Sequence, residues 1–139
     1  AYSTKNVIPH DKIMLVENLL STTGRTLYLK EEQQLNAVTA LSGSGPAYFF
    51  YFMKSLIDAG IQMGLEEHVA ATLAKQTMLG SFHLINSGNK TMDEFISSVA
   101  SKGGTTEAAL SVFNEDKMNE TILKALLKAE KRANELAIK

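Results

Sequence analysis

Apolar residues recur along this chain mostly at the three- and four-residue spacing of α-helices. Together with residues that start and stop helices, this spacing predicts helices over residues 11–22, 31–41, 46–63, 66–86, 91–100, 106–113 and from 116 onward. Only residues 25–30 and, more weakly, residues 1–4 show the alternation typical of β-strands. Two such strands do not make a stable sheet. The pattern therefore predicts an all-α helical bundle with one or two residual N-terminal strands.

Two of the expected helices are apolar on more than one side. On the helix at 46–63 the polar residues form one narrow stripe, made of Lys54, Asp58 and Gln62. The helix at 66–86 has two apolar stripes, one of Val69, Leu73, Thr77, Gly80 and Leu84 and a second of Met78, Phe82 and Ile85. A helix that is apolar all round is normally buried all round. A tight core within one chain would bury both, but so short a chain rarely supplies enough mass. We therefore favour a homodimer, with close backbone approach at Gly60 and Gly80.

Composition narrows the classes of function. The formal net charge is −1, so the chain lacks the excess of positive charge with which proteins bind nucleic acid or an anionic membrane. The most apolar stretch, residues 46–53, is interrupted by Lys54 and Asp58 long before the ~20 residues that a membrane span needs. There is no cysteine, which excludes disulfides, thiolate zinc sites and a cysteine nucleophile. Since the first residues also lack the apolar core of a signal peptide, we expect a cytoplasmic protein.

The stretch S-G-S-G, residues 42–45, has the glycine spacing of a phosphate-binding loop. A dinucleotide fingerprint needs a third glycine, but Tyr48 stands at that position, and the preceding residues have a helical pattern. The Gly-Lys-Ser/Thr ending of a P-loop is also missing. The stretch therefore predicts either a plain helix–helix turn or a glycine-rich helix start whose free N–H groups receive a ligand.

A second glycine-rich stretch, S-K-G-G-T-T at residues 101–106, precedes another expected helix. Two glycines allow close backbone approach, two threonines supply hydroxyls, and Lys102 adds positive charge. These features suit a small carboxylate at the positive end of a helix, although an ordinary helix cap has the same residues. The three histidines lack ligand spacing, and no nucleophile–base pair or metal cluster can be assembled from the sequence.

Four segments can be compared with known families by their order and spacing: A-V-T-A-L-S-G-S-G-P-A-Y (37–48), A-G-I-Q-M-G-L (59–65), A-K-Q-T-M-L-G (74–80) and V-A-S-K-G-G-T-T (99–106). In these segments the chain resembles the C-terminal half of pyrroline-5-carboxylate reductase. The resemblance implies an oxidoreductase of proline biosynthesis that reduces the cyclic imine pyrroline-5-carboxylate to proline with NADPH or NADH. In that family a Rossmann domain holds the dinucleotide. The helical domain forms an interlocked homodimer, sometimes assembled into larger rings of dimers.

The resemblance also implies a fragment. None of the fingerprint of the family's N-terminal domain is present, and the chain begins at Ala1 without methionine. We expect residues 1–30 to be a remnant of the end of the dinucleotide-binding domain. Residues 31–139 are then the helical dimerisation and substrate-binding domain. By itself the fragment is expected to bind no cofactor and to be inactive.

Site residues follow from the same resemblance. The implied substrate-binding residues are Ser101, Gly103, Gly104, Thr105 and Thr106. Ser101 and the backbone N–H groups around Gly104 and Thr105 would bind the carboxylate, and Thr106, as catalytic residue, would place its hydroxyl against the ring nitrogen. The residues expected near the nicotinamide are Ser42, Gly43, Ser44, Gly45 and Pro46. The family usually has proline at the position of Lys102, a departure that loosens the loop or adds charge near the carboxylate.

Two other functions compete with this one. The chain could be a non-catalytic dimerisation module of a paralogue, or the helical half of a related imine or β-hydroxyacid dehydrogenase. A pure dimerisation module has no need of intact S-G-S-G-P and G-G-T-T loops. The related dehydrogenases usually have a catalytic lysine within a long helix, but neither Lys54 nor Lys75 has a supporting motif around it. The reductase remains the favoured interpretation.

Overall fold

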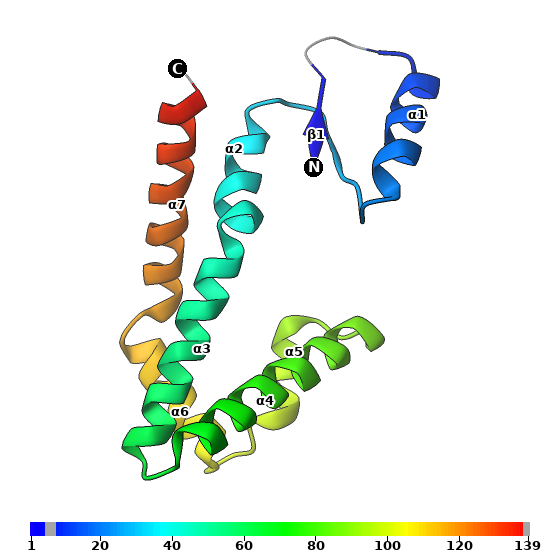
Figure 1. Cartoon of the computed structure of the whole chain (residues 1–139). Coiled ribbons are helices and arrows are strands. Elements are labelled where there is room, and N and C mark those ends of the chain that lie inside the picture. The colour runs from blue at the N-terminus through cyan, green and yellow to red at the C-terminus, as the bar shows by residue number, and fades with distance from the viewer. Residues whose placement is uncertain (5–7, 138–139) are drawn as a thin grey trace. The chain divides into compact units, whose positions relative to one another are not determined.

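The computed structural model of the chain describes residues 1–4 and 8–137. Residues 5–7 and 138–139, which fall within the predicted regions 1–30 and 31–139, lie outside the described residues. The described part is mainly helical, which confirms the predicted all-α class (Figure 1). Its helices are α1 (His10–Ser21), α2 (Gln34–Val38), α3 (Gly45–Gln62), α4 (Glu67–Ser87), α5 (Met92–Val99), α6 (Thr105–Glu115) and α7 (Met118–Ala137), and a π-helical turn, η1, spans Thr39–Gly43.

The two expected strands are present, and each is two residues long. β1 (Tyr2–Ser3) and β2 (Tyr28–Leu29) pair in parallel, with Tyr2 opposite Tyr28. The two tyrosine rings lie against each other, with centroids 5.3 Å apart. α1 lies between the strands in sequence, so the segment has the order of a β-α-β unit. A two-stranded pair of this size has little stability of its own.

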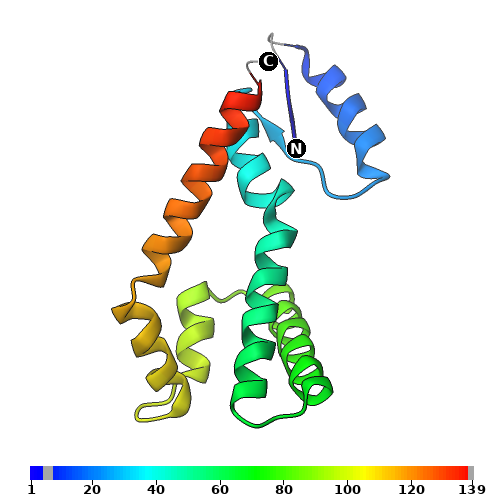
Figure 2. The ribbon, with the colours of Figure 1, turned by 60° about the vertical axis from the view of Figure 1, so that its left-hand side comes forward.

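Contacts divide the chain into two compact units. The first comprises Ala1–Gly45 with Lys124–Lys139, and the second comprises Pro46–Leu123. Within the first unit α2 lies beside the C-terminal turns of α7 (Figures 1 and 2). The Asn36 side-chain amide donates to Asn134 Oδ1 at 2.7 Å, which joins these two helices.

The second unit contains α3, α4, α5 and α6. Two buried residues, Gly60 in the last turn of α3 and Ala70 in the first turn of α4, pack together beside the connection between these helices. α5 begins with a capping box, as the sequence predicts: the Glu94 carboxylate accepts from the Thr91 N–H at 2.7 Å, and the Glu94 N–H donates to the Thr91 hydroxyl at 3.3 Å. Because both partners are local, this helix start needs no tertiary support.

Very little of the apolar side-chain surface is buried within the described part of the chain. Its only buried hydrophobic residues are Ala40 and Ala70. On α3, by contrast, Phe50 and Tyr51 are 72% and 76% exposed. α4 likewise exposes large apolar residues along its length, including Leu73, Phe82 and Leu84. Exposed apolar surface of this extent is typical of a protein–protein interface. No helix in the described residues is both long and apolar enough to cross a lipid bilayer.

Candidate functional site

The S-K-G-G-T-T segment forms a tight turn that leads into α6. The Gly104 N–H donates to the Ser101 carbonyl at 2.9 Å, which closes a four-residue turn over 101–104. Gly103, the third residue of this turn, has φ +74°. A positive φ at that position is the mark of a type II turn, in which the second position, here Lys102, favours proline. The turn therefore fixes the path of the backbone just before the helix.

Gly104 brings this turn into close contact with the helix start. It is the N-cap residue of α6, in an extended conformation. A Cβ atom at position 104 would lie 2.6 Å from Ser101 Oγ and 3.0 Å from the Ser101 carbonyl oxygen. Any larger residue would thus displace Ser101, and the absence of a side chain here keeps the Ser101 hydroxyl against the N-terminus of α6.

The first turn of α6 presents unpaired backbone donors. Within the described residues, the N–H groups of Thr105, Thr106 and Glu107 have no hydrogen-bond acceptor. Thr106 is half-buried, whereas Ser101 and Thr105 are exposed. Free N–H groups at the positive end of a helix attract an anion, and the nearby hydroxyls can orient it. The free donors at Thr105 and Thr106 suit a carboxylate, whereas the Gly104 N–H, which was predicted to take part, already donates to the Ser101 carbonyl.

Glu107 belongs to this cluster, although the sequence reasoning did not identify it. Its Oε2 accepts a hydrogen bond from the Gly103 N–H at 2.6 Å. Glu107 is the third helical residue after the N-cap glycine, a spacing at which a glutamate often reaches back over a helix start. That spacing is the sequence signal for this contact.

The S-G-S-G segment leads into α3, which begins at Gly45, and it includes the end of a π-helical turn that the sequence did not indicate. Thr39–Gly43 form the π-helical turn, and α3 follows after Ser44 alone. The Ser44 N–H donates to the Thr39 carbonyl at 2.9 Å, and the Ser42 hydroxyl donates to the Val38 carbonyl at 2.9 Å. Those two polar groups are therefore engaged within the chain. π-helical turns are rare and occur frequently at functional sites.

The predicted nicotinamide-proximal residues divide between the two compact units. Ser42–Gly45 belong to the first unit, while Pro46 and the 101–106 segment belong to the second. Pro46 lies in the first turn of α3, as predicted. A Cβ at Gly45 would meet nothing within 4 Å. None of the residues in segment 42–46 has a charged side chain.

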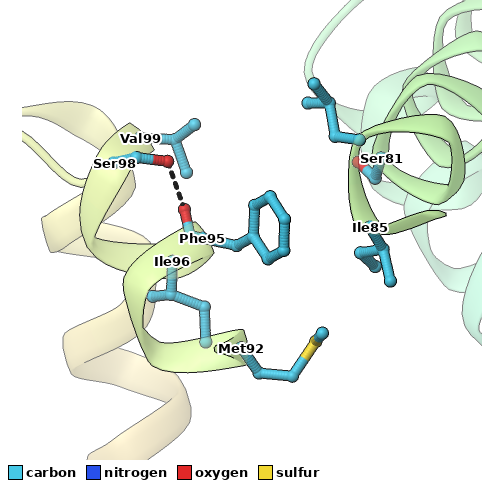
Figure 3. Close-up of a pocket in the computed structure, with 8 residues that line it drawn as sticks. Ser81, Ile85, Met92, Phe95, Ile96, Ser98 and Val99 are labelled. Atoms are coloured by element: carbon cyan, nitrogen blue, oxygen red, sulfur yellow. Dashed lines mark hydrogen bonds between the residues drawn. The ribbon is translucent and has the colours of Figure 1, made fainter. Parts of the chain in front are cut away.

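A separate apolar groove of about 260 Å³ lies between α4 and α5. The apolar residues that line it are Leu84, Ile85, Met92, Phe95, Ile96 and Val99. Figure 3 shows the Phe95 ring directed from α5 towards α4. The two serines of the groove donate within their own helices, Ser81 to Thr77 and Ser98 to Phe95. With no charged residue in its lining, the groove suits an apolar partner and not a polar metabolite. Across the described residues, no cluster of metal-ligating side chains is present.

Comparison with known proteins agrees with this geometry. The sequence model of the family described as pyrroline-5-carboxylate reductase dimerisation matches residues 32–136. The pyrroline-5-carboxylate reductase of Haemophilus influenzae is 39% identical over 121 residues, which cover 86% of this chain and 45% of that protein. The enzyme of Pseudomonas aeruginosa is 43% identical over 119 residues, covering 86% and 44%. This chain thus spans about half the length of these relatives.

Solved structures of similar proteins have the same fold. A pyrroline-5-carboxylate reductase from Coxiella burnetii superposes with a TM-score of 0.89 at 34% identity, covering 96% of this chain and 50% of that one. A Plasmodium falciparum pyrroline carboxylate reductase with NADP bound superposes with a TM-score of 0.81 at 29% identity, covering 94% and 49%. Both matches extend beyond the helical part to include nearly all of the chain.

Proposed function

This chain belongs to the pyrroline-5-carboxylate reductase dimerisation family, and from that premise we propose that it is the helical part of an enzyme that reduces pyrroline-5-carboxylate to proline with NADPH or NADH. In this proposal residues 31–139 are the dimerisation and substrate-binding domain, and residues 1–30 are the end of a dinucleotide-binding domain. The observation that carries it is the start of α6, where the first-turn N–H groups are unpaired, Ser101 Oγ lies against Gly104, and the first two helical residues are Thr105 and Thr106. A module used only for dimerisation has no need of such a carboxylate-binding site.

In this proposal the start of α6 binds the carboxylate of the substrate. The N–H groups of Gly103 and Gly104 are already bonded, to Glu107 and Ser101. The Thr105 and Thr106 N–H groups, assisted by the Ser101 hydroxyl, therefore receive the carboxylate. Gly104 acts by bringing Ser101 close, and Gly103 by giving the turn its shape. Charge-assisted hydrogen bonds of this kind fix both the position and the orientation of a small anion.

The Thr106 hydroxyl acts on the reacting end of the substrate. A protonated cyclic imine is already electrophilic, so the chief task of the protein is to hold the C=N carbon in line with the donor. When bound, the nicotinamide supplies the hydride. Thr106 contacts the ring nitrogen, and the uncharged segment 42–46 borders the ring of the cofactor. No acid–base pair is needed, because solvent supplies the proton.

Kinetics of the complete reductase test this assignment. Thr106→Ala should lower kcat/KM by roughly one to two orders of magnitude, since a hydrogen bond to a charged group contributes about 1.5–3 kcal/mol. Thr106→Ser retains the hydroxyl and should be much milder. Thr121→Ala, on the exposed surface of α7, is the matched control and should leave kcat/KM unchanged. If Thr106→Ala lowers the melting temperature but not the activity, Thr106 is only a structural residue of the helix start.

The same proposal includes a homodimer. Phe50 and Tyr51 on α3, and the apolar groove between α4 and α5, expose surface that a second copy of the chain can cover. Light scattering of the 139-residue chain at micromolar concentration should report a dimer, or a multiple of it if dimers assemble into rings. Phe50→Asp should shift the protein towards monomer. Gln62→Asp, on the polar stripe of the same helix, should not. A wild-type chain that is monomeric throughout would contradict the dimer.

The 139-residue chain alone should bind neither NADPH nor NADH measurably. The sequence has no dinucleotide fingerprint, and the segment 42–46 can contact only the nicotinamide end of such a cofactor. Calorimetric titration of both cofactors into the chain checks this, with the complete reductase as the positive control. Micromolar binding by the chain alone would show that its residues hold more of the cofactor than proposed.

A further inference from the structure

The carboxylate of Glu107 joins the middle of the substrate loop to the first turn of the helix that follows it. Its Oε2 lies 2.6 Å from the Gly103 backbone nitrogen, and the next N–H along the chain, that of Gly104, donates to the Ser101 carbonyl at 2.9 Å. Both glycine N–H groups of the loop therefore already donate hydrogen bonds within the chain. From this geometry we infer that Glu107 is a positioning residue for substrate binding, an inference that rests on the function proposed above.

Glu107 determines which donors the substrate can reach. Without its carboxylate the Gly103 N–H would be a further free donor, and an anion could bind across the glycines as well as at the start of α6. With the carboxylate in place, neither glycine N–H of the loop is free, while the first turn of the helix, which carries Thr106, keeps its free donors. The substrate carboxylate then has a single binding position, and the ring of the substrate takes the same position each time.

Glu107 also fixes a loop that has few other restraints. Ser101, Lys102 and Gly103 are exposed, and Gly103 has the conformational freedom of glycine. The Ser101–Gly104 bond closes the turn, and the Glu107–Gly103 bond ties that turn to α6. A loop fixed before the substrate arrives loses less conformational entropy on binding.

The charge of Glu107 opposes this benefit. A carboxylate near the helix start partly offsets the attraction that the free N–H groups exert on an anionic substrate. Glutamine would keep an oxygen acceptor for the Gly103 N–H and would remove the charge. Two substitutions therefore separate the effects. Glu107→Ala loses the hydrogen bond that positions the loop, whereas Glu107→Gln retains an acceptor for it and removes the repulsion between Glu107 and the anionic substrate.

The test uses the complete reductase with pyrroline-5-carboxylate as the varied substrate. Glu107→Ala should raise KM roughly three- to tenfold, with a smaller change in kcat, and should lower the melting temperature only slightly through loss of the bond to Gly103. Glu107→Gln should have a KM equal to or below that of the wild type. Glu115→Ala removes another exposed carboxylate from α6 and is the matched control. A merely structural glutamate would change the melting temperature and leave the ratio of KM to kcat unaffected.

A second measurement, on the 139-residue chain, does not depend on activity. Hydrogen exchange at the Gly103 amide should be faster in Glu107→Ala than in the wild type and should be slowed again in Glu107→Gln. A wild-type reductase that does not act on pyrroline-5-carboxylate overturns the proposed function together with this inference. An active enzyme in which Glu107→Ala has a normal KM, in which glutamine is as poor as alanine, or in which Gly103 exchange is unchanged overturns the role of Glu107 alone.

Discussion

Gly60 of α3 and Ala70 of α4 pack so closely that a Cβ atom on Gly60 would lie 2.9 Å from the Cβ of Ala70. Both residues are buried, and the Ala70 Cβ cannot move without its helix. Gly60→Ala should therefore lower the free energy of unfolding by about 1–2 kcal/mol, because overpacking costs more than the higher helix propensity of alanine returns. Urea unfolding at a fixed protein concentration measures this difference.

Gly80 of α4 provides the control for this packing. A Cβ at Gly80 would meet nothing within 4 Å in the chain, so Gly80→Ala should raise stability by roughly 0.5–1 kcal/mol through helix propensity alone. A loss that depends on protein concentration would instead show that a second copy packs against Gly80. If Gly60→Ala is as stable as Gly80→Ala, the α3–α4 contact is looser than described.

Lys117 supports a second prediction because it adopts a left-handed conformation, with φ 52°, between α6 and α7. This conformation costs a residue with a side chain roughly 1–2 kcal/mol. Lys117→Gly removes that strain but increases the freedom of the unfolded chain, and it loses the exposed 3.4 Å ion pair with Glu120, which contributes little. The expected net gain is about 0.5–1 kcal/mol, seen as a higher melting temperature. Lys117→Asn should gain less, and a lower melting temperature for glycine would rule out the strain.

The capping box of α5 predicts a dependence of stability on pH. Hydrogen bonds from the Thr91 backbone N–H, and then from the Thr91 side chain, lower the pKa of Glu94 below its ordinary value of 4.5. A carboxyl whose pKa is lower in the folded state stabilises the fold above its unfolded pKa. That contribution is lost as pH falls through the folded value. The melting temperature of Glu94→Gln should thus lie below that of the wild type near neutral pH, and the gap should narrow below pH 4.5. A gap for Glu94→Gln that stays constant down to acid pH would mean that the box contributes through its neutral hydrogen bonds only.

Local signals explain why most of the fold could be predicted from the sequence. Pro46 correctly marked the first turn of α3, and the Thr91–Glu94 spacing correctly marked the start of α5. Each of these features depends on residues within one turn of the backbone. The strands at the N-terminus were also recognisable, since the Tyr28 segment alternates as a strand does.

The features that were missed depend on choices that local patterns leave open. An α-helical turn with i→i+4 bonds and a π-helical turn with i→i+5 bonds differ little in energy. The sequence gives no separate signal for the π-helical turn at Thr39–Gly43. The spacing of Glu107 indicates that it can reach back over the helix start, but its partner, the Gly103 N–H, depends on the folded turn, in which Gly103 has a positive φ. The homodimer inferred from the apolar faces of α3 and α4 stays a prediction, because a second chain would have to be present to test it.

Lys102 occupies the second position of the turn closed by the Gly104–Ser101 bond. Gly103 has the positive φ that a type II turn requires at the third position, and proline is favoured at the second. Within the described residues the Lys102 N–H has no acceptor, so proline would remove no hydrogen bond. Lys102→Pro should raise the free energy of unfolding by about 0.4–1 kcal/mol, chiefly by restricting the unfolded chain.

Lys102→Ala separates this conformational effect from the effect of charge. Both substitutions remove the ammonium group, but only proline fixes φ near −65°. Differential scanning calorimetry should therefore rank proline above alanine in melting temperature. In the complete reductase, alanine should raise KM if the charge assists the substrate carboxylate, and proline should offset part of that rise by fixing the loop in advance. If the Lys102→Pro variant is less stable than the Lys102→Ala variant, the backbone at Lys102 does not have the type II geometry. The loop is then held by Glu107 and Ser101 alone.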